Sequence, residues 1–189
     1  MACGLIVEQG LSSALIVEDD VILPDDIDQI LDSLESEIRQ DDVISIYNRT
    51  MSIEKFSSFN AIEVGKRQIV CPLEARVMRT AAAYVIGKKT AEGISRINNP
   101  VKYVADDWQA FYEIGAVSRY RLLHPIPVKL WPFVSTLSYD STSTAHSLIR
   151  HALSLIPFNQ QLRQFRRAMI VKRREKNIRI VDEPSKFSL

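Results

Sequence analysis

The stretch ALIVEDDVIL, residues 14–23, joins four apolar residues directly to three acidic ones. Apolar residues without polar alternation are typical of a strand covered on both faces, as in a mostly parallel sheet with helices on either side. In open α/β sheets, ligands bind beyond the carboxyl ends of the strands, where Glu18, Asp19 and Asp20 would emerge. The stretch therefore predicts a buried strand that delivers three carboxylates to a binding edge.

These adjacent carboxylates allow two interpretations. Like charges repel one another, and a divalent cation that also holds phosphate oxygens relieves the repulsion. The plainer interpretation is that Asp19 and Asp20 only solvate a loop. The residues by themselves leave both interpretations open.

The composition is that of an ordinary globular protein, with 189 residues, 46% of them hydrophobic and 25% charged. This length is sufficient for one domain with a sizeable core. The net charge is +1, but residues 1–63 hold 14 Asp and Glu against 3 Lys and Arg, while residues 64–189 hold 9 against 21. The basic rear half favours an anionic partner such as a membrane surface, although solvated helix faces give the same pattern.

The location of the protein is predicted from its cysteines and its hydropathy. Cys3 and Cys71 lie far apart in the sequence and lack metal-ligand spacing. Two cysteines without a disulfide framework are typical of a protein in a reducing compartment. No apolar run approaches the roughly 18–20 residues of a membrane span, and the first residues lack the basic start of a secretion signal. We expect a cytoplasmic protein, with a peripheral position on the inner face of the cytoplasmic membrane as a second possibility.

Periodicity and turn residues predict alternating helices and strands. Gly10 is expected to end a first helix, and Asp25 and Asp26 to open an amphipathic one. Residues 48–67 are expected to be a polar loop. The remaining elements are predicted as strands at 42–47, 68–73 and 82–86, helices at 88–97 and 108–114, and extended segments at 101–104, 119–123 and 126–130.

A second acidic pair, Asp106 and Asp107, precedes the predicted helix at 108–114. An acid at this position can cap the helix N-terminus, which is the plainer interpretation, or it can take part in chemistry. Arg76, Arg79 and Thr80 lie between two predicted strands and are weaker candidates for contacts with phosphate or sugar.

The C-terminal region is basic. Residues 135–144 are expected to be a loop, and the pattern from residue 145 onward is helical, with an apolar side. A basic amphipathic helix can lie on an anionic lipid surface, so we expect peripheral membrane contact through residues 160–180, or else a solvated terminal helix. Nucleic acid is not expected, because aromatic and basic residues do not interleave. The predicted division is residues 1–140 as the main domain and 141–189 as a basic helical extension.

Other catalytic patterns are absent from the sequence. His124, His146 and His151 offer no metal-binding spacing, which also disfavours a metal-dependent phosphohydrolase. There is no G-x-S-x-G, P-loop or G-x-G-x-x-G motif.

Three segments together resemble glycosyltransferase family 25, the group that includes bacterial lipooligosaccharide β-galactosyltransferases. They are residues 14–23, RTAAAYVIGKKTAEGI at 79–94 and PVKYVADDWQAF at 100–111, and Tyr84 is the family's aromatic landmark. The resemblance implies an α/β fold of the GT-A-like type, a nucleotide-sugar-binding mixed sheet flanked by helices. Family members normally carry a further strand and helix in front, so it also implies a domain that is incomplete at its N-terminus.

The resemblance further implies a function. It points to inverting transfer of a hexose, with galactose expected, from a UDP-sugar to a lipopolysaccharide or other cell-surface glycan, assisted by Mn²⁺ or Mg²⁺. Nucleotide sugar and a glycan or glycolipid acceptor are the implied partners. The alternative is a truncated transferase remnant without catalysis, or a partner subunit of another transferase.

Site residues follow from matching the motifs position by position. Glu18 and Asp19 would bind the nucleotide, with Glu18 nearer the ribose, and Asp20 would be the metal ligand. Asp106 or Asp107 would be the base that takes the proton of the acceptor hydroxyl, with Asp107 preferred.

Overall fold

The structure is a computed structural model that describes residues 2–49, 52–131 and 176–187. The predicted loop at 135–144, most of the basic segment at 160–180 and the expected domain boundary at residue 140 lie outside these residues. No helix in the described ranges is both long and apolar enough to cross a bilayer.

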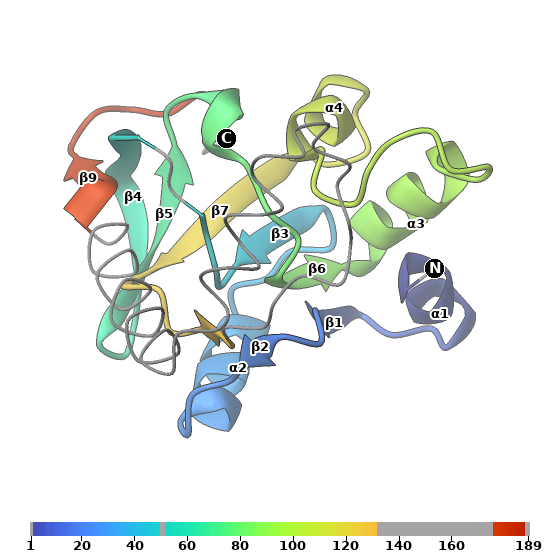
Figure 1. Cartoon of the computed structure of the whole chain (residues 1–189), viewed down its shortest axis with the longest axis horizontal. Coiled ribbons are helices and arrows are strands. Elements are labelled where there is room, and N and C mark those ends of the chain that lie inside the picture. Colours follow the sequence, from blue (N-terminus) through green and yellow to red (C-terminus); the bar gives the residue numbers. More distant parts are fainter. Residues whose placement is uncertain (1, 50–51, 132–175, 188–189) are drawn as a thin grey trace, which may run out of the picture.

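Within the described ranges, seven strands form one mixed sheet, and two short strands form a separate ladder beside it (Figure 1). The order in the large sheet is β1-β6-β3-β7-β5-β4-β9, and the ladder is β2-β8. Among the strands that the structure describes, only β3–β7 and β4–β9 are parallel neighbours. The strands are β1 Ser13–Val17, β2 Val21–Ile22, β3 Asp42–Ser45, β4 Glu54–Val64, β5 Arg67–Pro72, β6 Ala83–Gly87, β7 Arg119–His124, β8 Lys129–Leu130 and β9 Ile178–Val181. The predicted mixed α/β class is confirmed, whereas the expectation of a mostly parallel sheet is wrong.

Helices pack on both faces of the large sheet. Tyr84 and Ile86 of β6 belong to one apolar cluster with α1, α3 and α4, while Ala83 and Val85 belong to another with α2. Successive side chains of a strand point to opposite faces, so the two clusters mark the two sides of the sheet. Figure 1 shows α1 and α3 side by side, with α2 at a distance from them. The helices are α1 Ala2–Glu8, α2 Ile27–Glu35, the short 3-10 helix η1 Ala75–Val77, α3 Lys88–Ile97 and α4 Trp108–Glu113.

The strand formed by the opening stretch lies at an edge of the sheet. In the described residues β1 pairs with β6 alone, and that pairing is antiparallel. Ala14 and Ile16 pack against the α1–α3 side, and Leu15 packs against the α2 side. Both faces are therefore covered, which explains the unbroken apolar run. The strand was predicted to be buried, but it is only partly buried, because an edge strand keeps one side exposed.

Two segments differ from the predicted elements. Residues 54–64 of the expected polar loop form strand β4, whose register against β5 shifts between Ser57 and Ile62. A shift of this kind interrupts the alternation by which a strand is recognised. Residues 178–181 of the expected basic helix form β9, which runs parallel to β4. There Arg179 is exposed between Ile178 and Ile180, which is the period of a strand.

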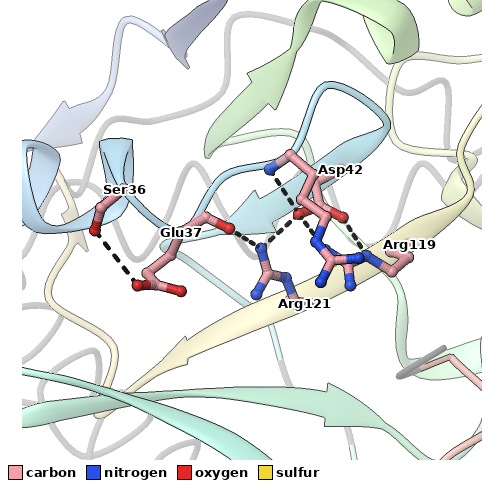
Figure 2. A network of polar contacts seen from close by, with 6 residues as sticks. Ser36, Glu37, Asp42, Arg119 and Arg121 are labelled. Atoms are coloured by element: carbon pink, nitrogen blue, oxygen red, sulfur yellow. Dashed lines mark hydrogen bonds and ion pairs between the residues drawn. The ribbon is translucent and has the colours of Figure 1, made fainter.

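A buried ion network joins β3 to β7 (Figure 2). Arg119 donates from Nε to Oδ1 of Asp42 at 2.6 Å and from Nη2 to Oδ2 at 2.9 Å. Arg121 donates from Nη2 to the same carboxylate and to the Glu37 carbonyl oxygen. Asp42 has no exposed surface. Hydrogen bonding to Asp42 raises the pKa of Arg119, and burial lowers the pKa of Arg121.

This network lies away from the acidic stretch. Asp42 is the first residue of β3, and β3 runs antiparallel to β6. Glu18 is hydrogen-bonded to Ala82, immediately before β6, and therefore lies at the opposite end of β3. The network thus stabilises the centre of the sheet and is not part of the site described next.

Candidate active site

Backbone hydrogen bonds hold the acidic stretch 18–20 at both ends. The N–H of Glu18 donates to the Ala82 carbonyl oxygen at 2.8 Å, which extends the pairing of β1 with β6. The N–H of Val21 donates back to the Glu18 carbonyl at 3.3 Å, and the N–H of Trp131 donates to the Asp20 carbonyl at 2.6 Å. The three acids therefore lie in a tight turn between β1 and β2.

The three carboxylates differ in exposure. Glu18 and Asp19 are exposed, while Asp20 is partly buried. Oδ1 of Asp20 is enclosed and accepts no hydrogen bond from any described residue. An enclosed acceptor is normally satisfied, so the missing partner of this oxygen departs from the usual pattern.

The fold brings Asp106 into electrostatic range of the acidic stretch. The pKa of Glu18 is raised above its ordinary value. Desolvation makes the largest contribution, and the negative charges of Asp20, Asp106 and Asp19 raise it further. The effect of Asp106 requires that the loop before α4 lie near the end of β1. Two acidic segments almost ninety residues apart in the sequence are thus close enough for their charges to interact.

Asp107 has a structural task. Its Oδ1 accepts a hydrogen bond from the Ala110 N–H at 3.2 Å, and it is the N-cap of α4. This is the capping role that the sequence offered as the plainer interpretation. Asp106 is exposed and has no hydrogen bond or ion pair with the described residues, so its carboxylate is the freer of the two.

An aromatic cluster anchors α4. Trp108, whose side chain is 1% exposed, has its ring centroid 4.8 Å from that of Tyr84 and 5.8 Å from that of Tyr120. Its ring also meets Phe111 edge to face. Tyr84 therefore packs against the residue that begins α4. Burial raises the pKa of the Tyr84 phenol.

Thr80 links α4 to the acidic stretch. Its carbonyl oxygen accepts a hydrogen bond from Trp108 Nε1 at 2.9 Å, and its Oγ1 accepts one from the Ala82 N–H at 3.3 Å. Its φ angle is 67°, in the left-handed region that β-branched residues rarely adopt. Arg76 forms an exposed ion pair with Glu74, and Arg79 Nε donates to the Arg76 carbonyl at 2.6 Å. Both arginines are thus engaged locally.

Asn98 shapes the loop that leads to Asp106, and sequence reasoning missed it. Its Oδ1 accepts hydrogen bonds from the N–H groups of Lys102 at 2.7 Å and Tyr103 at 2.9 Å, while Nδ2 donates to the Tyr103 carbonyl at 3.0 Å. The segment Asn98-Asn99-Pro100 was recognisable only as the end of a helix. A buried Asn that satisfies three backbone groups of one loop fixes its path.

The acidic stretch fits a divalent cation by its chemistry. Among the described residues, no group of three or more His, Cys, Asp and Glu side chains is arranged to hold a metal alone. Magnesium in nucleotide sites is commonly held by one or two carboxylates together with substrate phosphate oxygens and water. Residues 18–20 offer hard oxygen donors, and no described residue donates a hydrogen bond to Oδ1 of Asp20.

A mixed sheet flanked by helices, with clustered carboxylates where an edge strand ends, is the arrangement of a GT-A-like transferase. The sequence profile of glycosyltransferase family 25 (LPS biosynthesis protein) matches residues 4–109, more than half of the 189 residues. The chain belongs to this family, which confirms the resemblance drawn from the three segments. A comparison with curated proteins finds no match. Membership in a glycosyltransferase family implies a sugar donor and a glycan acceptor.

Proposed function

We propose that this chain transfers a hexose, with galactose expected, from a UDP-sugar to a lipopolysaccharide or other cell-surface glycan, with inversion and with Mn²⁺ or Mg²⁺. One observation carries the proposal: in a member of glycosyltransferase family 25, the charges of Asp19, Asp20 and Asp106 all act on Glu18. Clustered carboxylates of this kind suit a reaction in which a diphosphate leaves and a hydroxyl loses its proton.

The acidic stretch is assigned to the donor. Asp20 would hold the cation through its unpartnered Oδ1, while Glu18 and Asp19 would face the nucleotide, with Glu18 toward the ribose. When bound, the cation supplies Lewis-acid stabilisation of the negative charge that develops on the leaving UDP.

Asp106 is assigned as the base. In an inverting transfer the acceptor oxygen forms a bond to C1 of the hexose, the bond from C1 to the diphosphate oxygen breaks with its electron pair, and a carboxylate takes the hydroxyl proton. The motif comparison favoured Asp107 as the base, but Oδ1 of that residue caps α4. Asp106 is exposed and lies in range of Glu18, which supports it for this role. Asp107 then acts as a positioning residue.

Membrane contact remains part of the proposal on grounds of charge. The rear of the chain carries 21 Lys and Arg against 9 Asp and Glu. A basic segment at 160–180 would hold the transferase at an anionic bilayer, where lipid-linked acceptors lie. Sedimentation with vesicles that contain anionic lipid, compared with neutral vesicles, checks this point.

The decisive experiment combines binding and turnover in the purified full-length chain. Calorimetric titration with UDP and Mn²⁺ should show binding that Asp20→Asn weakens strongly. Release of UDP from UDP-galactose in the presence of a glycan acceptor should fall about 100-fold or more in Asp106→Asn, the usual scale for loss of a general base.

Asp32→Asn is the matched control, because Asp32 is an exposed acid on α2, away from the site. It should retain wild-type binding and turnover. Absence of UDP binding, or binding unchanged in Asp20→Asn, contradicts the proposed donor site. Binding without any turnover would favour the remnant or partner-subunit alternative.

A further inference from the structure

The two tryptophans of the chain have opposite environments. Trp108 is 1% exposed, while Trp131 is 54% exposed. Tryptophan is highly buried on average in folded proteins. An indole that is more than half accessible therefore needs an explanation from its surroundings.

Trp131 lies directly beside the acidic stretch. It follows β8, which pairs with β2 in the register Leu130 to Val21. Its own N–H continues this ladder by donating to the Asp20 carbonyl oxygen at 2.6 Å. The backbone of Trp131 is thus one hydrogen bond from the residue proposed to hold the cation, and its position is fixed by strand pairing.

Other exposed apolar side chains lie next to the same acids. Val17, 43% exposed, precedes Glu18, and Val104, 66% exposed, lies two residues before Asp106. Glu18 and Asp106 interact electrostatically. The carboxylates are therefore accompanied by accessible apolar groups from β1, from the loop before α4 and from the end of β8.

This combination matches the two-sided chemistry of a hexose ring. Hydroxyl groups of the sugar can donate hydrogen bonds to carboxylates, while one face of the pyranose presents C–H groups. The face of an aromatic ring carries partial negative charge and attracts such weakly positive hydrogens. Binding sites for small molecules commonly combine apolar lining with a few polar groups that fix orientation.

We propose that the indole of Trp131 is the platform on which a hexose ring stacks at this site, an inference that rests on the proposed function. The shared chemistry is the C–H face of a pyranose, supplied either by the hexose of the nucleotide sugar or by the terminal hexose of the acceptor. Trp131 is thereby a substrate-contacting residue that sequence patterns did not identify.

Tryptophan fluorescence can report on the indole of Trp131 separately from that of Trp108. Because Trp108 is buried and Trp131 is exposed, the difference in emission between the wild-type chain and Trp131→Phe reports on Trp131 alone. With Mn²⁺ present, titration with UDP-galactose should shift this difference spectrum to shorter wavelength if the donor hexose covers the ring. UDP without a sugar should leave it unchanged.

Substitution measures the contribution to binding. Trp131→Leu keeps apolar bulk but removes the aromatic face, and should weaken binding of one hexose about 5- to 10-fold, while Trp131→Phe should lose less. Phe59→Leu, at an exposed aromatic residue of β4, is the matched control and should change neither substrate. Binding is compared well below the midpoint of thermal unfolding of each variant, so that only folded chains are compared.

Two arms distinguish the source of the hexose. Weaker binding of UDP-galactose in Trp131→Leu, with binding of UDP unchanged, assigns the platform to the donor. A higher KM for methyl β-galactoside or methyl β-glucoside as acceptor, with donor binding unchanged, assigns it to the acceptor. If both substrates behave as in the wild-type chain while transfer persists, the inference is overturned and the proposed function stands. If the wild-type chain neither binds nor uses UDP-galactose, both are overturned.

Discussion

The indole Nε1 of Trp108 donates a hydrogen bond of 2.9 Å to the carbonyl oxygen of Thr80. Thr80 in turn accepts a hydrogen bond from the N–H of Ala82, whose carbonyl oxygen receives the N–H of Glu18. The first residue of α4 and the first acid after β1 are therefore held by one short segment, residues 80–82. The separation between the two acidic segments depends on this connection.

Replacing Trp108 by Phe should weaken that connection. The substitution keeps an aromatic ring but removes the Nε1 donor, and it leaves the part-buried Thr80 carbonyl without this partner. We expect a loss of about 1–3 kcal/mol in the free energy of unfolding, together with lower transferase activity because Asp106 is less well positioned. Urea denaturation checks the first expectation. Phe59→Leu, at an exposed aromatic residue of β4, serves as the control, and equal stability of the two variants would contradict the role of the hydrogen bond.

Replacing Thr80 by Asn tests the strained backbone. A β-branched residue at a φ of 67° costs about 1–3 kcal/mol. Asn tolerates this conformation well, and Asn60 adopts a φ of 60° in this chain. We expect Thr80→Asn to raise the free energy of unfolding by about 1 kcal/mol. Thr80→Val, which keeps the strain and loses the hydroxyl, should be less stable than the wild-type chain. A chemical denaturation series in which Asn proves the worse of the two would refute this explanation.

The raised pKa of Glu18 predicts a pH dependence of stability in the metal-free chain. Because the folded state makes this carboxyl harder to ionise, folding is penalised once the pH rises from the ordinary value of 4.5 through the raised pKa. Glu18→Gln should therefore unfold at a higher temperature than the wild-type chain at pH 7, and at the same temperature below pH 4.5. The difference should be small, since Glu18 is exposed.

Thermal unfolding in EDTA measures this difference, and addition of Mn²⁺ and UDP provides the complementary experiment. The bound cation would offset the repulsion among the carboxylates, so it should stabilise the wild-type chain more than Glu18→Gln. A difference that grows toward acidic pH would have the wrong sign and would exclude carboxylate repulsion as its cause.

Replacing Asp42 by Asn should destabilise the centre of the sheet. The substitution leaves two buried guanidinium groups, those of Arg119 and Arg121, without an opposing charge. Removing one partner of a buried ion network costs about 3–5 kcal/mol. Glu74→Gln breaks the exposed pair with Arg76 and should leave unfolding unchanged. Equal effects of the two substitutions in urea denaturation would show that burial does not decide the strength of these pairs.

Sequence patterns predicted the elements whose period is regular. The helices that became α2 and α3, and the strands that became β3, β5 and β6, have clear apolar periodicity and clear breakers at their ends. Strand β4 was missed because its register shift interrupts the alternation. Strand β9 was mistaken for a helix because Arg179 and its basic neighbours outweighed the short alternation around them.

The candidate site was only partly accessible to such reasoning. Clustered charge at the end of an apolar run pointed to residues 18–20, and the adjacent pair at 106–107 was visible as well. The choice between Asp106 and Asp107 depends on which side chain turns back to cap α4, and that is a property of the fold. Asn98 and Thr80 act through backbone contacts that leave no charge or period in the sequence.

The position of β7 determines where this chain can be divided. β7 lies between β3 and β5 in the sheet, but its residues come after the segment at 4–109 that defines the family. A polypeptide cut at the end of that segment would hold β1, β6 and β3 in one group and β5 and β4 in another, and no described strand of one group pairs with a strand of the other. The segment that the family profile matches therefore leaves out β7, the strand that joins the two groups into one sheet.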